Sequence, residues 1–300
     1  MGKLLIVCGA TATGKSELAV KCAQKLNSEI ISADSQLVYK KLNIGTAKPT
    51  QDEMCGIKHH MIDVIEPTEN YSVSDYRKDA KTIVDNLLTE GKTPIICGGT
   101  GFYINSVLYD LSYGKSAANL EVREKYETLL KENGNAYLYN LLKSIDCDTA
   151  DKLHVNDTKR IIRALEIYET SGIKKSEFKD DYKPLYDYLA VAVDYPREEL
   201  YKRIDMRVDK MFEAGLVDEV INLLNNGVNE FSQCMQAIGY KEVVQGLKNK
   251  HLESTMRDKI KQNTRHYAKR QITFFKKLKN IVWIEPENAT AEYVLEMLNG

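Results

Sequence analysis

A glycine-rich segment near the N-terminus has the residue types and spacing of a loop that binds phosphate groups. Residues 9–16 read GATATGKS after an apolar run and before a helix-like stretch. The two glycines allow the backbone to wrap a phosphate, and the N–H groups at the start of the helix point at it. A lysine then adds positive charge near the outer phosphate, and a serine hydroxyl can bind Mg²⁺. The segment predicts diphosphate or polyphosphate binding by Gly9, Ala10, Thr11, Ala12, Thr13, Gly14, Lys15 and Ser16.

One carboxylate, Asp34, is the candidate for acid–base chemistry. It follows the apolar run 29–33, where it could bind Mg²⁺ through water or accept a proton from a bound nucleophile. A turn or helix-capping role is the alternative. The apolar run 93–97 ends in glycines, whereas ordinary P-loop ATPases carry an acidic residue at a strand end that binds Mg²⁺. This difference disfavours an ATPase or GTPase and makes Asp34 the principal carboxylate.

Three further groups of residues have weaker signals. The GGTG segment that contains Thr100 could bring backbone and a hydroxyl against a ligand, or form a plain turn. Arg203 and Arg207 are four residues apart and share a helix face, which suits either a diphosphate or a solvated salt-bridge stripe. His59 and His60 are adjacent and therefore do not share a face, so they do not make a convincing metal pair.

Charge is unevenly distributed along the chain. The 300 residues carry a net charge of −1, with 43% hydrophobic and 28% charged residues, as in soluble globular proteins. Residues 254–280 contain nine Lys or Arg and one acid, so this segment carries +8 and the remainder −9. Such asymmetry favours a polyanion-binding surface over a solvated helix face. Lys159, Arg160 and Arg163 form a second basic face, and residues 269–276 interleave cations with aromatics, as RNA-binding segments do.

Composition also bears on the cellular compartment. No apolar run is long enough to span a bilayer, and Met1 leads directly into the first apolar run, so we expect neither a membrane span nor a leader peptide. The six cysteines are scattered without a C-x-x-C pair, which is typical of reduced thiols rather than of disulfides or structural zinc. We therefore expect a cytoplasmic protein, and we expect it to be a monomer.

The elements that must position these residues alternate between strands and helices. Strand-like apolar runs occur at 4–7, 29–33, 93–97, 188–193 and 281–284. Helical patterns lie between them, which predicts an α/β fold with a P-loop NTPase-like parallel sheet covered by helices. Ligands gather at the carboxyl ends of such strands, so the phosphate loop, Asp34 and the GGTG segment should share one crevice.

The middle of the chain has a different pattern. Between residues 114 and 187 helical stretches at 119–133 and 157–170 replace the strands. This pattern predicts an all-helical insertion domain. The P-loop α/β core would then comprise residues 1–113 and 188–300, and its second part would end in the basic helix.

Taken together, these motifs resemble those of the tRNA dimethylallyltransferases, also called tRNA isopentenyltransferases, of the bacterial type without a zinc-finger tail. The resemblance runs nearly from end to end and follows the family's order. It includes GATATGKS at 9–16, DSQLVY at 34–39, IGTAKP at 44–49, HHMID at 59–63, GGTGFY at 98–103, NDTKRIIRALE at 156–166, RIDMRVDKM at 203–211, QAIGYKE at 236–242 and TRHYAKRQ at 264–271. Ala10 stands where many members have proline, a change we expect to be tolerated because backbone N–H groups bind the ligand.

The resemblance implies transfer of a dimethylallyl group from dimethylallyl diphosphate to N6 of the adenosine 3′-adjacent to the tRNA anticodon, with Mg²⁺ as cofactor. Asp34, Thr100 and Arg207 would be catalytic, Asp34 accepting the N6 proton. Arg207 would also bind the diphosphate, and Ser16 the Mg²⁺. The anticodon stem-loop would contact Asp34, Ser35, Gln36, Leu37, Thr100, Arg123, Lys159, Arg160, Ile161, Ile162, Arg163, Gln236, Ala237, Ile238, Gly239, Tyr240, Lys241, Lys269, Arg270, Gln271 and Phe274.

Three alternatives stay open at the level of sequence. An isopentenyltransferase acting on free adenine nucleotides would not need the basic helix or the basic insertion. A P-loop small-molecule kinase would need ATP and no RNA surface. A non-catalytic P-loop RNA-binding module would not need Asp34.

Overall fold

A computed structural model describes residues 3–111 and 119–300 of the chain. They form two compact units, one comprising Met1–Leu108 and Pro184–Gly300 and the other Tyr109–Lys183. The expected boundary between residues 113 and 114 lies outside the described residues, and the second junction falls at Lys183–Pro184, four residues before the expected one. Within the described ranges no helix is both long and apolar enough to cross a bilayer. All six cysteines are free thiols.

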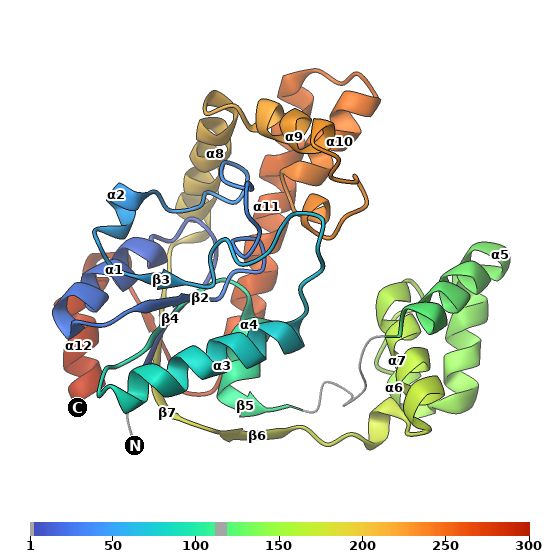
Figure 1. Cartoon of the computed structure of the whole chain (residues 1–300), viewed down its shortest axis with the longest axis horizontal. Helices are drawn as coiled ribbons and strands as arrows, with labels where there is room; N and C mark the ends of the chain where they lie inside the picture. The colour runs from blue at the N-terminus through green and yellow to red at the C-terminus, as the bar shows by residue number, and fades with distance from the viewer. Residues whose placement is uncertain (1–2, 112–118) are drawn as a thin grey trace. The chain divides into compact units, whose positions relative to one another are not determined.

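The first unit is built on a six-stranded sheet with the order β3-β2-β4-β1-β7-β8 (Figure 1). Each neighbouring pair is parallel, as the alternation of strands and helices predicted. The strands are β1 (Lys3–Cys8), β2 (Ile30–Ser32), β3 (His59–His60), β4 (Ile95–Gly98), β7 (Asp187–Val193) and β8 (Ile281–Ile284). The five predicted strands are thus confirmed. Strand β3 is not predictable from the sequence, because two histidines carry no apolar strand pattern.

Helices cover both faces of this sheet. On one face α1 (Lys15–Leu26) and α12 (Ala291–Asn299) pack together over a core that includes Leu5, Val7 and Val191 (Figure 1). The other face lies against α3 (Val73–Thr89) and α4 (Gly101–Leu108) (Figure 1). Because alternate strand residues point to opposite faces, the continuous apolar runs of the central strands pack against the helices on both faces of the sheet.

A group of helices after β7 completes the first unit. It comprises α8 (Arg197–Glu213), α9 (Leu216–Asn225), α10 (Tyr240–Lys248) and α11 (Glu253–Phe275). The short helix α2 (Gln51–Met54) also belongs to the first unit but precedes β3 in the chain. Helix α11 packs against α8, α10 and α4. This packing brings the basic helix from near the C-terminus to the strand ends.

The second unit has its own core. Its helices are α5 (Leu120–Ile145), α6 (Cys147–Ala150) and α7 (Thr158–Ser171), and the core includes Leu138, Leu142 and Leu165, all fully buried. Helix α5 is kinked at Gly134, where φ is 79°, and α7 ends at Ser171, followed by Gly172 with a φ of 70°.

The prediction of an all-helical insertion is wrong in one respect. Strands β5 (Tyr109–Asp110) and β6 (Asp181–Pro184) pair as a two-stranded ribbon. All four residues of β6 are exposed and read DYKP, so the segment lacks the alternating apolar pattern by which a strand is recognised.

Candidate active site

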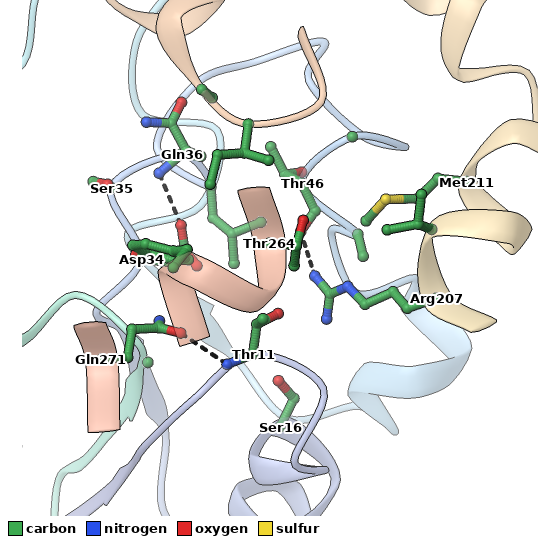
Figure 2. A pocket seen from close by; sticks show the side chains of 18 of the residues that line it. Thr11, Ser16, Asp34, Ser35, Gln36, Thr46, Arg207, Met211, Thr264 and Gln271 are labelled. Carbon is green, nitrogen blue, oxygen red and sulfur yellow. Dashed lines mark hydrogen bonds between the residues drawn. The ribbon is translucent and has the colours of Figure 1, made fainter. Parts of the chain in front are cut away.

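A cavity of about 350 Å³ lies at the carboxyl ends of the central strands in the first unit (Figure 2). Lys15, Asp34 and Gly98 all line it. The prediction that the phosphate loop, the carboxylate and the GGTG segment share one crevice is therefore confirmed. Helices α8 and α11 complete the wall, contributing Arg207 and Gln271 among other residues.

The glycine-rich loop between β1 and α1 has the backbone that its sequence requires. Gly9 and Gly14 have φ values of 125° and 80°, in the region that favours glycine. The buried Thr13 hydroxyl donates to the carbonyl oxygen of Ala10 at 2.9 Å, and Lys15 Nζ donates to the same oxygen at 3.2 Å. Helix α1 begins at Lys15, so its first backbone N–H groups have no intrahelical partners and face the loop's interior as an anion site.

Two cations, Lys15 of this loop and Arg207 of α8, line the cavity. Burial lowers the pKa of Lys15, and the nearby charge of Arg207 lowers it further. Burial likewise lowers the pKa of Arg207, against the opposing effect of Asp34. An anion between two partly desolvated cations stabilises both, because without it each cation lacks solvation and is repelled by the other. The geometry therefore favours an anionic ligand at this end of the cavity.

The two arginines predicted to share a face of α8 bond to two different loops of the site. Arg203 Nε donates to the carbonyl oxygen of Ala12 at 2.8 Å, and its guanidinium lies 4.6 Å from the ring centroid of Tyr195. Arg207 Nη2 donates to the carbonyl oxygen of Thr46 at 3.2 Å (Figure 2). The solvated salt-bridge stripe, which was the alternative for this pair, is therefore wrong. Arg203 braces the phosphate loop, and Arg207 lines the cavity.

Asp34 is half-buried at the end of β2 and is held by its neighbours. Its Oδ1 accepts a hydrogen bond from the backbone N–H of Gln36 at 2.9 Å (Figure 2). The Thr100 hydroxyl accepts from Ser35 N at 3.1 Å, and Thr100 N donates to Ala33 O at 2.9 Å. The GGTG segment thus fixes the backbone on both sides of Asp34. The expected catalytic role of Thr100 stays a prediction.

The side chain of Gln271 joins three parts of the site. Its Oε1 accepts from Thr11 N at 2.9 Å (Figure 2), and its Nε2 donates to Gly99 O at 3.0 Å. A side chain at Gly99 would overlap this amide, which explains the glycine. Gln271 lines the cavity but is only 5% exposed, and both ends of its amide are bonded inside the protein. Its expected contact with tRNA stays a prediction. Its residue type and helix position gave no sign of these distant partners.

Four other residues expected to contact tRNA are also buried. The side chains of Ile161, Ile162 and Tyr240 lie in protein cores, and Gly239 precedes Tyr240 at the start of α10. These residues present little or no side-chain surface, and their expected contact with tRNA stays a prediction. In a motif, core and contact residues look alike. Exposed members of the expected set are Lys159, Arg160, Gln236, Lys241, Lys269 and Arg270.

In the second unit a buried carboxylate organises the predicted basic residues. Glu166 is fully buried, and its Oε2 lies 2.9 Å from Arg123 Nε and 2.8 Å from Arg163 Nη1. Its Oε1 accepts from Asn119 N at 2.7 Å. These hydrogen bonds, with Arg163 first, outweigh burial and lower the pKa of Glu166. The carboxylate therefore holds Arg123 and Arg163 in place, a role that the sequence analysis did not assign.

Part of the charge on α11 is neutralised within the first unit. Arg265 Nη1 lies 2.7 Å from Asp205 Oδ1, and Lys261 Nζ lies 2.7 Å from Asp209 Oδ1. Arg257 Nη1 also reaches Asp209, at 3.3 Å. The +8 counted along the sequence therefore overstates the charge that α11 offers to a ligand.

The C-terminal end of α11 carries two adjacent aromatics with different roles. Phe275 is fully buried, while Phe274 is half-buried against Gly101, with its ring centroid 5.6 Å from that of the exposed Phe102. Phe275 is therefore a core residue. Of the two histidines considered as a metal pair, His60 lies 2.6 Å from Glu29 Oε2 through Nε2, and His59 Nδ1 is bonded to Ile57 O.

Comparison with known proteins gives a consistent result. The sequence model of the IPP transferase family matches residues 37–278. The tRNA dimethylallyltransferase of Caldanaerobacter subterraneus subsp. tengcongensis is 46% identical over 286 residues, covering 94% of this chain and 91% of the relative. That of Alkaliphilus oremlandii is 44% identical over 288 residues, covering 95% and 92%.

The structure of this chain also superposes on solved structures of such transferases. The tRNA isopentenylpyrophosphate transferase from Bacillus halodurans superposes with a TM-score of 0.74 at 36% identity, covering 100% of this chain and 95% of the other. A eukaryotic dimethylallyltransferase acting on tRNA superposes with a TM-score of 0.80 at 30% identity, covering 97% and 74%.

Proposed function

This chain belongs to the IPP transferase family, and we propose that it transfers a dimethylallyl group from dimethylallyl diphosphate to N6 of the adenosine 3′-adjacent to the tRNA anticodon. The observation that carries the proposal is the composition of one cavity, where the cations Lys15 and Arg207 lie beside the carboxylate Asp34. Cations suit a diphosphate leaving group, and a carboxylate suits the proton of an amine nucleophile.

The reaction makes matching demands on these groups. A bond forms between N6 and the allylic carbon while the bond from that carbon to the diphosphate oxygen breaks. The electron pair leaves with diphosphate, so negative charge grows there, and N6 becomes positive until it loses a proton. Lys15, Arg207 and the backbone N–H groups of the phosphate loop would stabilise the departing diphosphate. Asp34 would accept the N6 proton.

The site also suits Mg²⁺ bound together with a diphosphate. Among residues 3–111 and 119–300 no group of three or more His, Cys, Asp or Glu side chains could hold a metal. Mg²⁺ bound through phosphates needs only one or two protein oxygens, however, and keeps water as its other ligands. Ser16 lines the cavity (Figure 2) and would supply its hydroxyl, with Asp34 available through water. When bound, the ion would neutralise diphosphate oxygens.

The surfaces of both units support an RNA substrate. In the first unit Lys269 and Arg270 are exposed near the C-terminal end of α11, and Arg270 lines the cavity. In the second unit Lys159 and Arg160 are exposed at the start of α7. The target adenine must leave its stack to enter the cavity. We further propose that the enzyme is cytoplasmic. We also propose that it works as a monomer, since one chain supplies every protein group that the proposed reaction uses.

One experiment distinguishes this function from its rivals. The protein is incubated with Mg²⁺, dimethylallyl diphosphate and unmodified tRNA, and the nucleosides are analysed by mass spectrometry for one added C5H8 unit on adenosine. Parallel reactions replace tRNA with AMP or ATP, and a Lys15→Ala variant serves as the control for the phosphate loop. Prenylation of free nucleotide without prenylation of tRNA would identify the nucleotide transferase. ATP consumption without prenyl transfer would identify a kinase.

A further inference from the structure

We propose that Glu219 on α9 is a positioning residue whose carboxylate fixes the cavity-lining loop 43–46 and thereby sets the position of Arg207. The inference rests on the proposed function for the identity of the diphosphate. The geometry that carries it lies entirely within the first unit.

The first observation is a run of backbone N–H groups that converge on one carboxylate. Glu219 Oε2 accepts hydrogen bonds from Asn43 N at 3.0 Å and Ile44 N at 2.8 Å, and its Oε1 accepts from Gly45 N at 3.2 Å. Consecutive N–H groups in a loop form a concave site for an anion. Here a side chain from a helix more than 170 residues away along the chain supplies that anion, so the loop's conformation depends on Glu219.

The second observation is a tyrosine that secures both the carboxylate and the loop. Tyr240 OH donates to Glu219 Oε1 at 2.6 Å, and the tyrosine side chain is fully buried. Burial, followed by the nearby charge of Glu219, raises the pKa of Tyr240, so the hydroxyl remains a donor. A Cβ at Gly45 would lie 2.5 Å from the Tyr240 ring. The ring therefore packs directly on the loop backbone, which explains why position 45 is glycine.

The third observation connects this loop to the cations of the site. Gly45 and Thr46 line the cavity, and Arg207 Nη2 donates to the carbonyl oxygen of Thr46 (Figure 2). The Thr46 hydroxyl in turn donates to Leu42 O at 2.7 Å. Contacts thus run from Glu219 through the loop to the guanidinium that would meet the diphosphate. A loop released from Glu219 would remove an acceptor from Arg207 and shift one wall of the cavity.

A purely local role for Glu219 does not account for these contacts. Both carboxylate oxygens bond to other segments, the 43–45 backbone and Tyr240 at the start of α10. The adjacent carboxylate Asp218 is exposed on the same helix turn, so it offers a matched control for the change in charge.

The test compares Glu219→Ala and Glu219→Gln with Asp218→Asn in folded, full-length protein. Displacing a positioning group by about 1 Å can cost up to about 100-fold in rate. We expect Glu219→Ala to lower kcat/KM for dimethylallyl diphosphate by about 10- to 100-fold, mainly through KM. Glu219→Gln, which keeps one acceptor oxygen, should recover part of the loss. Asp218→Asn should stay within about 3-fold of wild type, and tRNA affinity should change little in all three.

A second measurement does not depend on prenyl transfer. Hydrogen exchange of the amides of residues 43–46 should accelerate in Glu219→Ala while the amides of β1 and β4 keep their protection, and inorganic diphosphate should bind more weakly. Unchanged KM and unchanged exchange in a folded Glu219→Ala would overturn the proposal. So would faster exchange throughout the unit, which would mark a general loss of stability. If wild-type protein does not prenylate tRNA, the proposed function fails, while the exchange and diphosphate measurements still decide the role of Glu219.

Discussion

Replacement of Gln271 by leucine is the substitution whose effect the structure predicts most fully. Leucine has nearly the same volume but cannot replace the hydrogen bonds to Thr11 N and Gly99 O. An unpaired buried donor or acceptor costs about 1–3 kcal/mol, so the two together should cost about 2–6 kcal/mol of unfolding free energy. At about 2–4 °C per kcal/mol for a chain of this size or slightly smaller, Tm should fall by about 4–24 °C.

Thermal unfolding of the ligand-free protein, followed by circular dichroism, measures this loss. Gln262→Leu is the matched control, because Gln262 is exposed on the same helix and should leave Tm nearly unchanged. Affinity for inorganic diphosphate should also fall in Gln271→Leu, since Thr11 belongs to the phosphate loop. A normal Tm combined with weakened tRNA binding would refute the reasoning, because it would mean that the Gln271 amide serves the RNA rather than the protein interior.

Three further outcomes follow from the described contacts. Asp34→Asn keeps the shape of the side chain but removes the basic carboxylate, so single-turnover rates should fall by about 10²–10⁴-fold while the Kd for tRNA stays near that of wild type. Lys269→Gln should reduce the salt dependence of tRNA binding by about one unit of slope, whereas Arg257→Gln should leave the slope unchanged, because Arg257 is paired with Asp209. A hydrogen bond from Lys92 is the main cause that lowers the pKa of Glu29 from 4.5 to about 2, so the Glu29 carboxylate stabilises the fold above pH 4.5 and progressively less towards pH 2. Glu29→Gln should therefore lower Tm at pH 7, and its difference from wild type should narrow between pH 4.5 and 2.

The parts of the site that were predictable from the sequence depend on short contiguous patterns. The loop from Gly9 to Ser16 has its glycines, lysine and serine at fixed spacing, and the strand before it and helix after it are equally local. Asp34 and Thr100 are far apart in the sequence, but both follow apolar strands. Because parallel strands bring their carboxyl ends to one edge, topology alone placed them together.

The contacts that hold those residues in place carry no comparable pattern. Gln271 and Glu219 are ordinary polar residues on amphipathic helices, and the loop backbone groups that they bind lie 172 to 260 residues away. A helix face that packs against loop backbone looks in sequence like a face exposed to water. For the same reason a motif resemblance could not separate Tyr240, which is buried, from Lys241, which is exposed.

The cations of the basic helix α11 fall into two groups, one paired with acidic residues and one exposed, although the sequence alone counts them as a single charge. In its N-terminal part Arg257, Lys261 and Arg265 bond to Asp205 and Asp209 on α8, so these cations hold two helices together. The spacing of the two aspartates matches that of the cations they face, since residues four apart share a helix face. The part near the C-terminus has no such acidic partner helix among its described contacts, and there Lys269 and Arg270 remain exposed beside the cavity. Gln271, next in sequence, turns inward to the phosphate loop. One turn of α11 thus exposes two cations to solvent and also binds the phosphate loop through Gln271. The residues that would meet RNA and the residue that supports the diphosphate site are therefore neighbours in the sequence.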